Sequence, residues 1–155
     1  MVEGEPTVAS VDVRIRPAVH ADAAPLLDLK RLLDQESRFM LLEPDERTAS
    51  VEEVASELHA MSAAPNCTVL VAEPAGKLVG YVEANGGRFR RNRVPADVVI
   101  GVAAAASGGV GSALMAGLVR WTGGAGLRRL ELTVMTHNRR ARRLYKGAGF
   151  VEEGR

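Results

Sequence analysis

Residues 98–121 read VVIGVAAAASGGVGSALMAGLVRW, and this stretch decides the fold. It opens with an apolar run that predicts a strand over Asp97–Val102, buried on both faces near the centre of a sheet. A glycine-rich turn comes next over 107–111, and a helical pattern then runs from Ser112 to about Trp121. Gly123, Gly124 and Gly126 are expected to end it. The first backbone N–H groups of a helix have no partner within it. The stretch therefore predicts a site where a phosphate or pyrophosphate meets a helix N-terminus.

The residues after the glycine turn narrow the identity of that anion. A nucleoside-triphosphate loop needs a lysine after its last glycine, whereas Gly111 is followed by Ser112 and Ala113. A dinucleotide fingerprint needs a third glycine at the place of Leu114. Both of those interpretations are weakened. The remaining alternative is a tight turn that holds nothing, although three glycines in four residues exceed what such a turn needs.

The rest of the chain alternates between the periods of strands and helices. Predicted strands cover Val11–Arg16, Thr68–Glu73, Lys77–Glu83 and Leu130–Met135, and another starts over Phe150–Glu152. Predicted helices begin near Asp22, which is placed to cap the first, at Ser50 with a capping box to Glu53, and at Asn138, which caps the last helix up to Ala148. The order predicts an α/β (α+β) fold with a mixed sheet flanked by helices. We expect residues 1–10 to be a flexible tail and residues 11–155 to form a single domain.

Composition limits the classes of protein. The 155 residues are 46% hydrophobic and 25% charged, an ordinary globular balance, and Cys67 is the only cysteine. No apolar run is long enough to cross a bilayer, and the N-terminus lacks the basic and apolar pattern of a signal peptide. We therefore expect a cytoplasmic protein with no membrane contact. The three histidines show no metal-ligand spacing, and six aromatic residues without a known motif argue against nucleic acid.

Charge is unevenly distributed along the chain. Residues 1–65 carry 13 acidic and 6 basic side chains, and residues 66–155 carry 6 acidic and 14 basic ones. Such an asymmetry favours an anionic ligand held by the later part, or else reflects two solvated faces.

The second informative stretch is NRRARRLYKGAGF at 138–150. With the preceding glycine turn, this pattern resembles the GNAT acetyltransferases. Two other stretches are typical of the same family: IRPA at 15–18 followed by Asp22-Ala23, and LVGY at 78–81. A third stretch, ESRFMLLEP at 36–44, is similar to a bacterial subgroup of the family. The resemblance covers about Val13 to Arg155 and implies a mostly antiparallel sheet.

The resemblance also implies acetyl-CoA as donor and an amine as acceptor. In the family, the strand matching Val99–Val102 splays from its neighbour at Leu132–Val134, and the pantetheine arm lies in that gap. Tyr145 corresponds to the usual general acid. The residues that correspond to the cofactor site are Ile100, Gly101, Val102, Ser107, Gly108, Gly109, Val110, Gly111, Ser112, Asn138 and Tyr145.

The chemistry of amide formation adds a second catalytic role. An alkyl amine is mostly protonated at neutral pH, so a base must remove a proton before the amine attacks. Glu83, at the end of the hairpin strand, is our candidate for this base, although an exposed strand-end carboxylate is the simpler interpretation. Asp97 and Glu36 are weaker candidates. The backbone N–H near Val102 could stabilise the oxyanion.

Two departures from the family pattern lead to further expectations. Ala106 and Ser107 stand where a basic or amide residue and a glycine are usual, so we expect weaker cofactor binding. The pattern ends at Arg155 without the last strand of the family, so we expect an exposed sheet edge and, as a hypothesis, a homodimer.

Two other classes of function stay open. One is a non-catalytic acyl-CoA-binding module of the same fold, and the other is a nucleotide-dependent oxidoreductase. The acceptor itself, a small molecule or a peptide amine, is not identified by the sequence.

Overall fold

The computed structural model describes residues 13–36, 46–87, 95–106, 108–125, 129–134 and 138–153, and the predicted tail 1–10 lies outside them. Its centre is a sheet of five strands: β1 (Ile15–Pro17), β2 (Cys67–Ala72), β3 (Gly80–Gly86), β4 (Pro95–Val102) and β5 (Arg129–Glu131). The helices are α2 (Ala23–Glu36), which comes after a short 3-10 turn η1 (His20–Asp22), then α3 (Val51–Ala63), α4 (Val110–Ala125) and α5 (Arg139–Gly147). None of these helices is long and apolar enough to cross a membrane.

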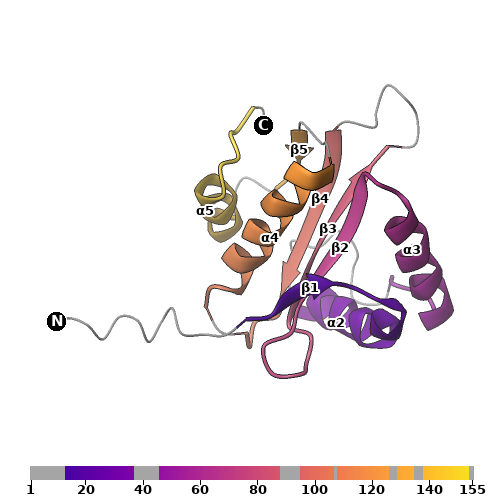
Figure 1. Ribbon diagram of the computed structural model, residues 1–155. Coiled ribbons are helices and arrows are strands. Elements are labelled where there is room, and N and C mark those ends of the chain that lie inside the picture. Colours follow the sequence, from indigo (N-terminus) through magenta and orange to yellow (C-terminus); the bar gives the residue numbers. More distant parts are fainter. Residues whose placement is uncertain are drawn as a thin grey trace.

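The sheet is mixed and mostly antiparallel, as the sequence predicted. Its strands lie in chain order, β1 to β5. The first four pair antiparallel, whereas β5 runs parallel to β4. A parallel neighbour needs a crossover, and α4 supplies it on one face of the sheet (Figure 1).

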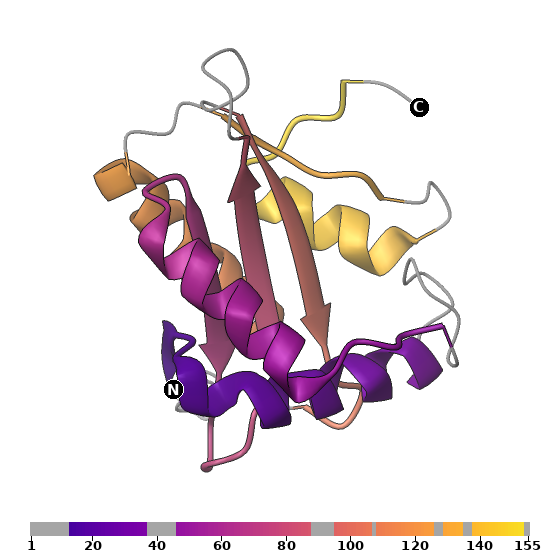
Figure 2. The ribbon, with the colours of Figure 1, turned by 90° about the vertical axis from the view of Figure 1, so that its right-hand side faces the viewer.

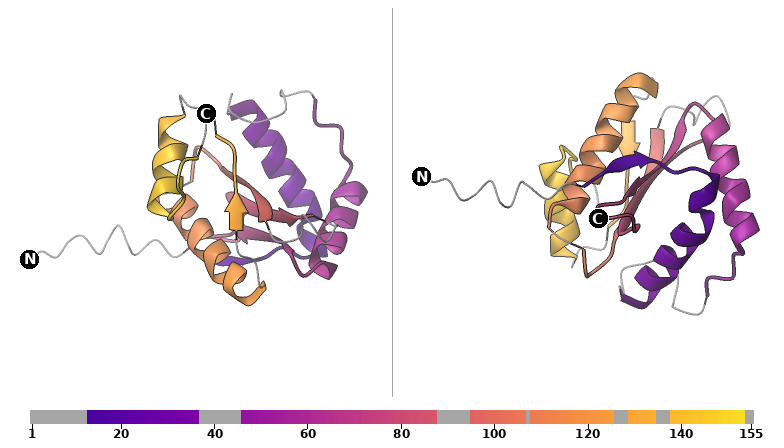
Figure 3. Two further views of the ribbon diagram at one scale, coloured as in Figure 1. Left: turned by 90° about the horizontal axis from the view of Figure 1, so that it is seen from above. Right: turned by 60° about the horizontal axis from the view of Figure 1, so that its bottom comes forward.

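Helices cover the sheet on two sides. Helices α2 and α3 lie on one face, and α4 with α5 lies on the other (Figures 2 and 3). Alternate strand residues point to opposite faces, so each face has its own apolar core. Val69, Val71 and Tyr81 pack with α2 and α3. Leu70, Val82 and Val98 pack with α4.

The helix caps predicted at Ser50 and Asn138 are present, whereas the carboxylate of Asp22, also predicted as a cap, accepts its hydrogen bonds from Arg16 and from the N–H of Val19. The Oγ of Ser50 accepts a hydrogen bond from the N–H of Glu53 (3.1 Å), and the Glu53 carboxylate accepts one from the N–H of Ser50 (3.0 Å). The side chain of Asn138 accepts from the N–H of Ala141 (3.2 Å). These caps satisfy helix-start donors that would otherwise lack partners.

The prediction that Asp97–Val102 is buried on both faces is wrong. Val99 is 47% exposed, whereas Ala96 and Val98 on the other face are buried. The backbone of Gly101 lies under Leu33 of α2. Because Val99 lies beyond the part of β4 that α2 covers, its face of the strand stays open.

Predicted boundaries in the last third of the chain also need correction. β5 ends at Glu131 instead of Met135, and Phe150–Glu152 is not a strand. The reason at Phe150 is local: Gly149 adopts a positive φ of 102°, and the N–H of Phe150 donates to the carbonyl of Tyr145 (2.9 Å). This turn caps α5. Helix α4 continues through Gly123 and Gly124 to Ala125, since neither glycine has a positive φ.

The remaining boundaries shift by a few residues. β1 begins at Ile15, and residues 11 and 12 of its predicted strand lie outside the described residues. β3 begins at Gly80 rather than Lys77 and continues to Gly86.

Candidate active site

The glycine turn leads directly from β4 into α4. Gly109 has a φ of 94°, a backbone conformation that favours glycine. A Cβ added at Gly108 or Gly109 would meet nothing within 4 Å, so the backbone there is open to a ligand. The first turn of α4 contains no acidic residue that would repel an anion. Of the other predicted residues here, Ser112 is exposed, and Ser107 lies outside the described residues.

Two residues of the turn serve packing as well. The side chain of Val110 is 1% exposed and belongs to the core beneath α4, so only its backbone faces a ligand. A Cβ on Gly111 would lie 3.1 Å from Cδ2 of Leu144. The missing side chain of Gly111 therefore lets α4 approach α5. This contact brings the helix that carries Tyr145 beside the start of α4.

The edge of β4 that faces β5 is largely unpaired. The register pairs Pro95 with Arg129, Ala96 with Leu130 and Asp97 with Glu131, and goes no further. Residues 132–134 are not strand. From Val98 to Val102, β4 therefore pairs only with β3 among the described residues. Backbone groups on this free edge, which includes the predicted Ile100, Gly101 and Val102, are available to an extended ligand.

Helix α5 carries Tyr145, and Asn138 is its N-cap. Tyr145 packs against the core on the α4 side of the sheet, edge-to-face with Phe150 at a centroid distance of 6.1 Å. Burial raises the pKa of the Tyr145 hydroxyl above its ordinary value. The hydroxyl is therefore protonated at neutral pH and can donate a proton.

Glu83 lies on the opposite face of the sheet, under α2. Its Oε1 is 2.5 Å from Nζ of Lys30, and the side chains are 20% and 12% exposed. Nζ of Lys30 also lies 5.1 Å from the centre of the Tyr81 ring. Burial is the main cause of the raised pKa of Tyr81, and the charges of Glu83 and, more weakly, Tyr145 raise it too.

A second ion pair, between Arg47 and Asp34, involves helix α2. Arg47 makes two hydrogen bonds to the carboxylate of Asp34, at 2.6 and 3.0 Å. The side chain of Asp34 is completely buried. The pair raises the pKa of Arg47, so the guanidinium stays charged. It fixes the end of α2 to the segment before α3.

The two weaker base candidates lie apart from this pair. Asp97 is exposed on β4 and lies in register with Asn85. The carboxylate of Glu36 accepts a hydrogen bond from the N–H of Ala104 (2.9 Å). Glu36 therefore ties α2 to the segment that leads into the glycine turn.

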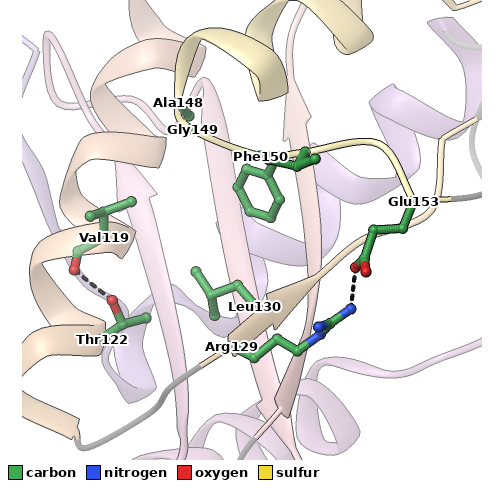
Figure 4. Close-up of a pocket in the computed structure, with 9 residues that line it drawn as sticks. Val119, Thr122, Arg129, Leu130, Ala148, Gly149, Phe150 and Glu153 are labelled. Atoms are coloured by element: carbon green, nitrogen blue, oxygen red, sulfur yellow. Dashed lines mark hydrogen bonds and ion pairs between the residues drawn. The ribbon is translucent and has the colours of Figure 1, made fainter.

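A separate hollow of about 360 Å³ lies at the far end of α4. Its walls come from α4, β5 and the segment after α5, and Figure 4 shows Phe150 and Leu130 on opposite sides of it. Arg129 crosses one end to an ion pair with Glu153. No residue of the predicted cofactor site lines this hollow.

Lys30 and the Asp34–Arg47 pair were not predicted from the sequence. A signal for two of them was available: Lys30 comes four residues after Leu26, and Asp34 comes four after Lys30, so both lie on the inner face of α2. A charged residue on an inward helical face needs a buried partner.

Comparison with known proteins agrees with this geometry. The sequence profile of the Acetyltransferase (GNAT) family matches residues 27–150. A GNAT-family acetyltransferase from Streptococcus pneumoniae is 33% identical, with a TM-score of 0.89 over 92% of this chain and 87% of that one. A ribosomal-protein-alanine N-acetyltransferase from Brucella melitensis is 26% identical, with a TM-score of 0.80 over 91% and 86%.

A third solved structure is a putative acetyltransferase from Salmonella typhimurium, described with its cofactor acetyl-CoA. It is 23% identical, with a TM-score of 0.78 over 90% of this chain and 79% of that one. No curated protein matches the sequence. The profile match over most of the chain and the 33% identical relative show that this protein belongs to the GNAT acetyltransferase family.

Proposed function

We propose that the protein is an N-acetyltransferase that moves an acetyl group from acetyl-CoA to a primary amine by direct attack. The observation that carries the proposal is the free edge of β4 beside an open glycine turn at the start of α4. An extended, phosphate-bearing donor needs both features, the edge for its arm and the helix start for its anion. The acetyl-CoA described with the Salmonella typhimurium relative supports this choice of donor.

The residues proposed to hold the donor fall into three groups. Ile100, Gly101 and Val102 offer backbone groups on the edge of β4. Ser107, Gly108, Gly109, Val110, Gly111 and Ser112 offer N–H groups at the helix start. Asn138 and Tyr145 approach from α5. We propose that the donor binds here without a metal.

Acetyl-CoA supplies the acetyl thioester, and the chain's own residues move the protons. The acceptor arrives as an ammonium ion and loses one proton before it attacks. It loses a second proton as the N–C bond forms and the C–S bond breaks, so one of the two protons balances the proton needed at the sulfur and the other passes to solvent. We assign removal of protons from the nitrogen to Glu83 and protonation of the sulfur to Tyr145. Glu83 is ion-paired with Lys30, and it can accept a proton only after that ammonium moves away.

Donor binding is proposed to be weaker than the family pattern implies. Ala106 brings no charge or amide to the turn. A guanidinium at this place would add a charge-assisted bond to a phosphate, worth about 1.5–3 kcal/mol.

The alternative is a non-catalytic acyl-CoA-binding module of the same fold. The Lys30–Glu83 contact favours it, since a base held in an ion pair cannot work. Turnover separates the two. An oxidoreductase function, carried by nucleotide binding at the same turn, would require NAD to bind in preference to acetyl-CoA.

Two further expectations belong to this proposal. We place the protein in the cytoplasm, with a small molecule or peptide as acceptor. The outer edge of β5 has no strand partner among the described residues, so we propose a homodimer through it. A monomeric mass by light scattering would contradict that proposal.

Isothermal titration with acetyl-CoA, with NAD as the control, tests the function. Saturable heat with acetyl-CoA alone establishes the donor site and justifies an acceptor screen. No binding at millimolar acetyl-CoA would remove the basis for both the catalytic and the binding-module proposals.

A further inference from the structure

One lysine of α2 is buried against a strand in an unusual setting. The side chain of Lys30 is 12% exposed, and its ammonium lies between the carboxylate of Glu83 and the ring of Tyr81. A carboxylate and an aromatic face are the two groups that proteins use to hold an alkylammonium ion. We call Tyr81 and Glu83 together the ammonium cage.

Tyr81 is itself buried beneath α2. The residue is 2% exposed, and burial raises the pKa of its hydroxyl, so the ring stays neutral at neutral pH and its face can attract an ammonium ion.

One side of the cage borders an exposed strand residue. Glu83 on β3 lies in register with Val99 on β4, and Val99 is 47% exposed on the same face. Neighbouring strands lie about 4.8 Å apart. A group that reaches Glu83 past Val99 therefore lies one strand away from the free edge of β4. Figure 2 shows the face on which α2 and α3 lie in front of these strands.

We propose that the ammonium cage binds the acceptor amine and that Lys30 is its internal occupant. An alkylammonium acceptor would take the place of Nζ between Tyr81 and Glu83. The Lys30 side chain, with its four-carbon stem, would swing toward solvent. The acceptor class that fits is an alkyl primary amine, since an uncharged amide or alcohol cannot replace an ammonium beside a carboxylate.

The direction of attack on the donor rests on the proposed function, but occupation of the cage does not need acetyl-CoA. The test therefore begins without the donor. Lys30→Ala removes a propylammonium group, so n-propylammonium is the matching probe. We expect n-propylammonium to raise the Tm of Lys30→Ala saturably, by mass action.

Three controls isolate the cage. n-Propanol has the same size without the charge and is expected to give no shift. Lys77→Ala removes an exposed lysine and should not respond to the probe. The double variant Lys30→Ala/Glu83→Gln lacks the carboxylate and should lose the response. An equal shift in all of these proteins, or none in Lys30→Ala, would overturn the cage.

Lys30→Met tests whether the acceptor displaces the Lys30 ammonium from the cage. Its long apolar side chain also keeps helix α2 packed, which matters if the alanine variant fails to fold. Without an internal competitor, the KM for an alkylamine acceptor should fall about tenfold, the equivalent of 1.4 kcal/mol, with a smaller change in kcat. A raised KM would overturn the displacement. A saturable n-propylammonium shift without any acetyl transfer would count against the proposed function and leave the cage standing.

Discussion

At the scale of the residue, Tyr145 carries the clearest catalytic expectation. Tyr145→Phe keeps the ring contact with Phe150 and removes the hydroxyl. We expect kcat to fall by about 10²–10⁴, the usual contribution of a general acid, with little change in the Kd for acetyl-CoA. Phe150→Leu is the matched control, since it loses the ring contact and keeps the hydroxyl. An unchanged kcat in Tyr145→Phe would assign the acid to another group.

Tyr81, which is buried, and Tyr145, which is half-buried, also predict how stability depends on pH. Burial raises the pKa values of both Tyr81 and Tyr145 in the folded protein, whereas an unfolded tyrosine titrates near about 10. Above that pH the unfolded chain loses protons that the folded chain retains, so stability is complete below about pH 10 and falls as the pH rises further. Urea unfolding at about pH 8 to 11 measures this fall. In Tyr81→Phe the unfolding free energy should fall less steeply with pH. A fall as steep as that of the wild type would contradict the assignment of the pH dependence to Tyr81.

Single residues show where sequence reasoning succeeds. The caps at Ser50 and Asn138 depend on neighbours three residues away, so the sequence alone predicts them. Lys30 and Glu83 are 53 residues apart, and their contact depends on how α2 lies across β3. No local pattern in the sequence specifies that crossing.

At the scale of the element, the crossing of α2 over β4 depends on one glycine. A Cβ at Gly101 would lie 2.6 Å from Cδ1 of Leu33 and 2.9 Å from Cε1 of Tyr81. We expect Gly101→Ala to cost about 1–3 kcal/mol of unfolding free energy, as overpacked cores do. Gly124→Ala in α4 is the control: nothing lies within 4 Å, and alanine favours helix, so stability should rise. Equal effects of the two substitutions in urea unfolding would refute the argument.

The cap of α5 sets the position of Tyr145. This helix has Arg139 and Arg140 in its first turn, where positive charge opposes the helix dipole. Asn138→Ala should therefore cost about 0.5–2 kcal/mol. Asn138→Asp keeps the acceptor and adds a favourable charge, so thermal unfolding should show it at least as stable as the wild type. A loss of stability in the aspartate variant would mean that the amide group itself is needed.

Elements were predicted well where period and caps agree, and poorly where tertiary contacts decide their ends. The helix over 138–148 was recognised because its cap and its glycine stop are local. β5 ends at Glu131, where its pairing with β4 stops, although β4 itself continues to Val102. Phe150 leaves the strand pattern because it packs on Tyr145. These ends depend on tertiary neighbours as well as on local sequence.

At the scale of the whole molecule, the mixed sheet was predictable because strand, turn and helix signals point to one order. The open face at Val99 could not be predicted in this way. A strand that is apolar throughout is expected to be buried on both sides, and only the structure shows how far the covering helix extends. The sequence thus indicates which backbone could hold a donor, while the face that we propose for the acceptor can be identified only in the folded chain.

The short pairing between β4 and β5 leads to the last prediction. Three residue pairs join β5 to the rest of the sheet, and the proposed donor would lie where this pairing stops. Hydrogen exchange should therefore slow on binding acetyl-CoA over residues 98–102 and 108–113, and much less in β2, which lies two strands away. NAD should give no such pattern. Uniform slowing along the chain would indicate general stabilisation, and slowing confined to the hollow lined by Leu130 and Phe150 would move the donor to the other end of α4.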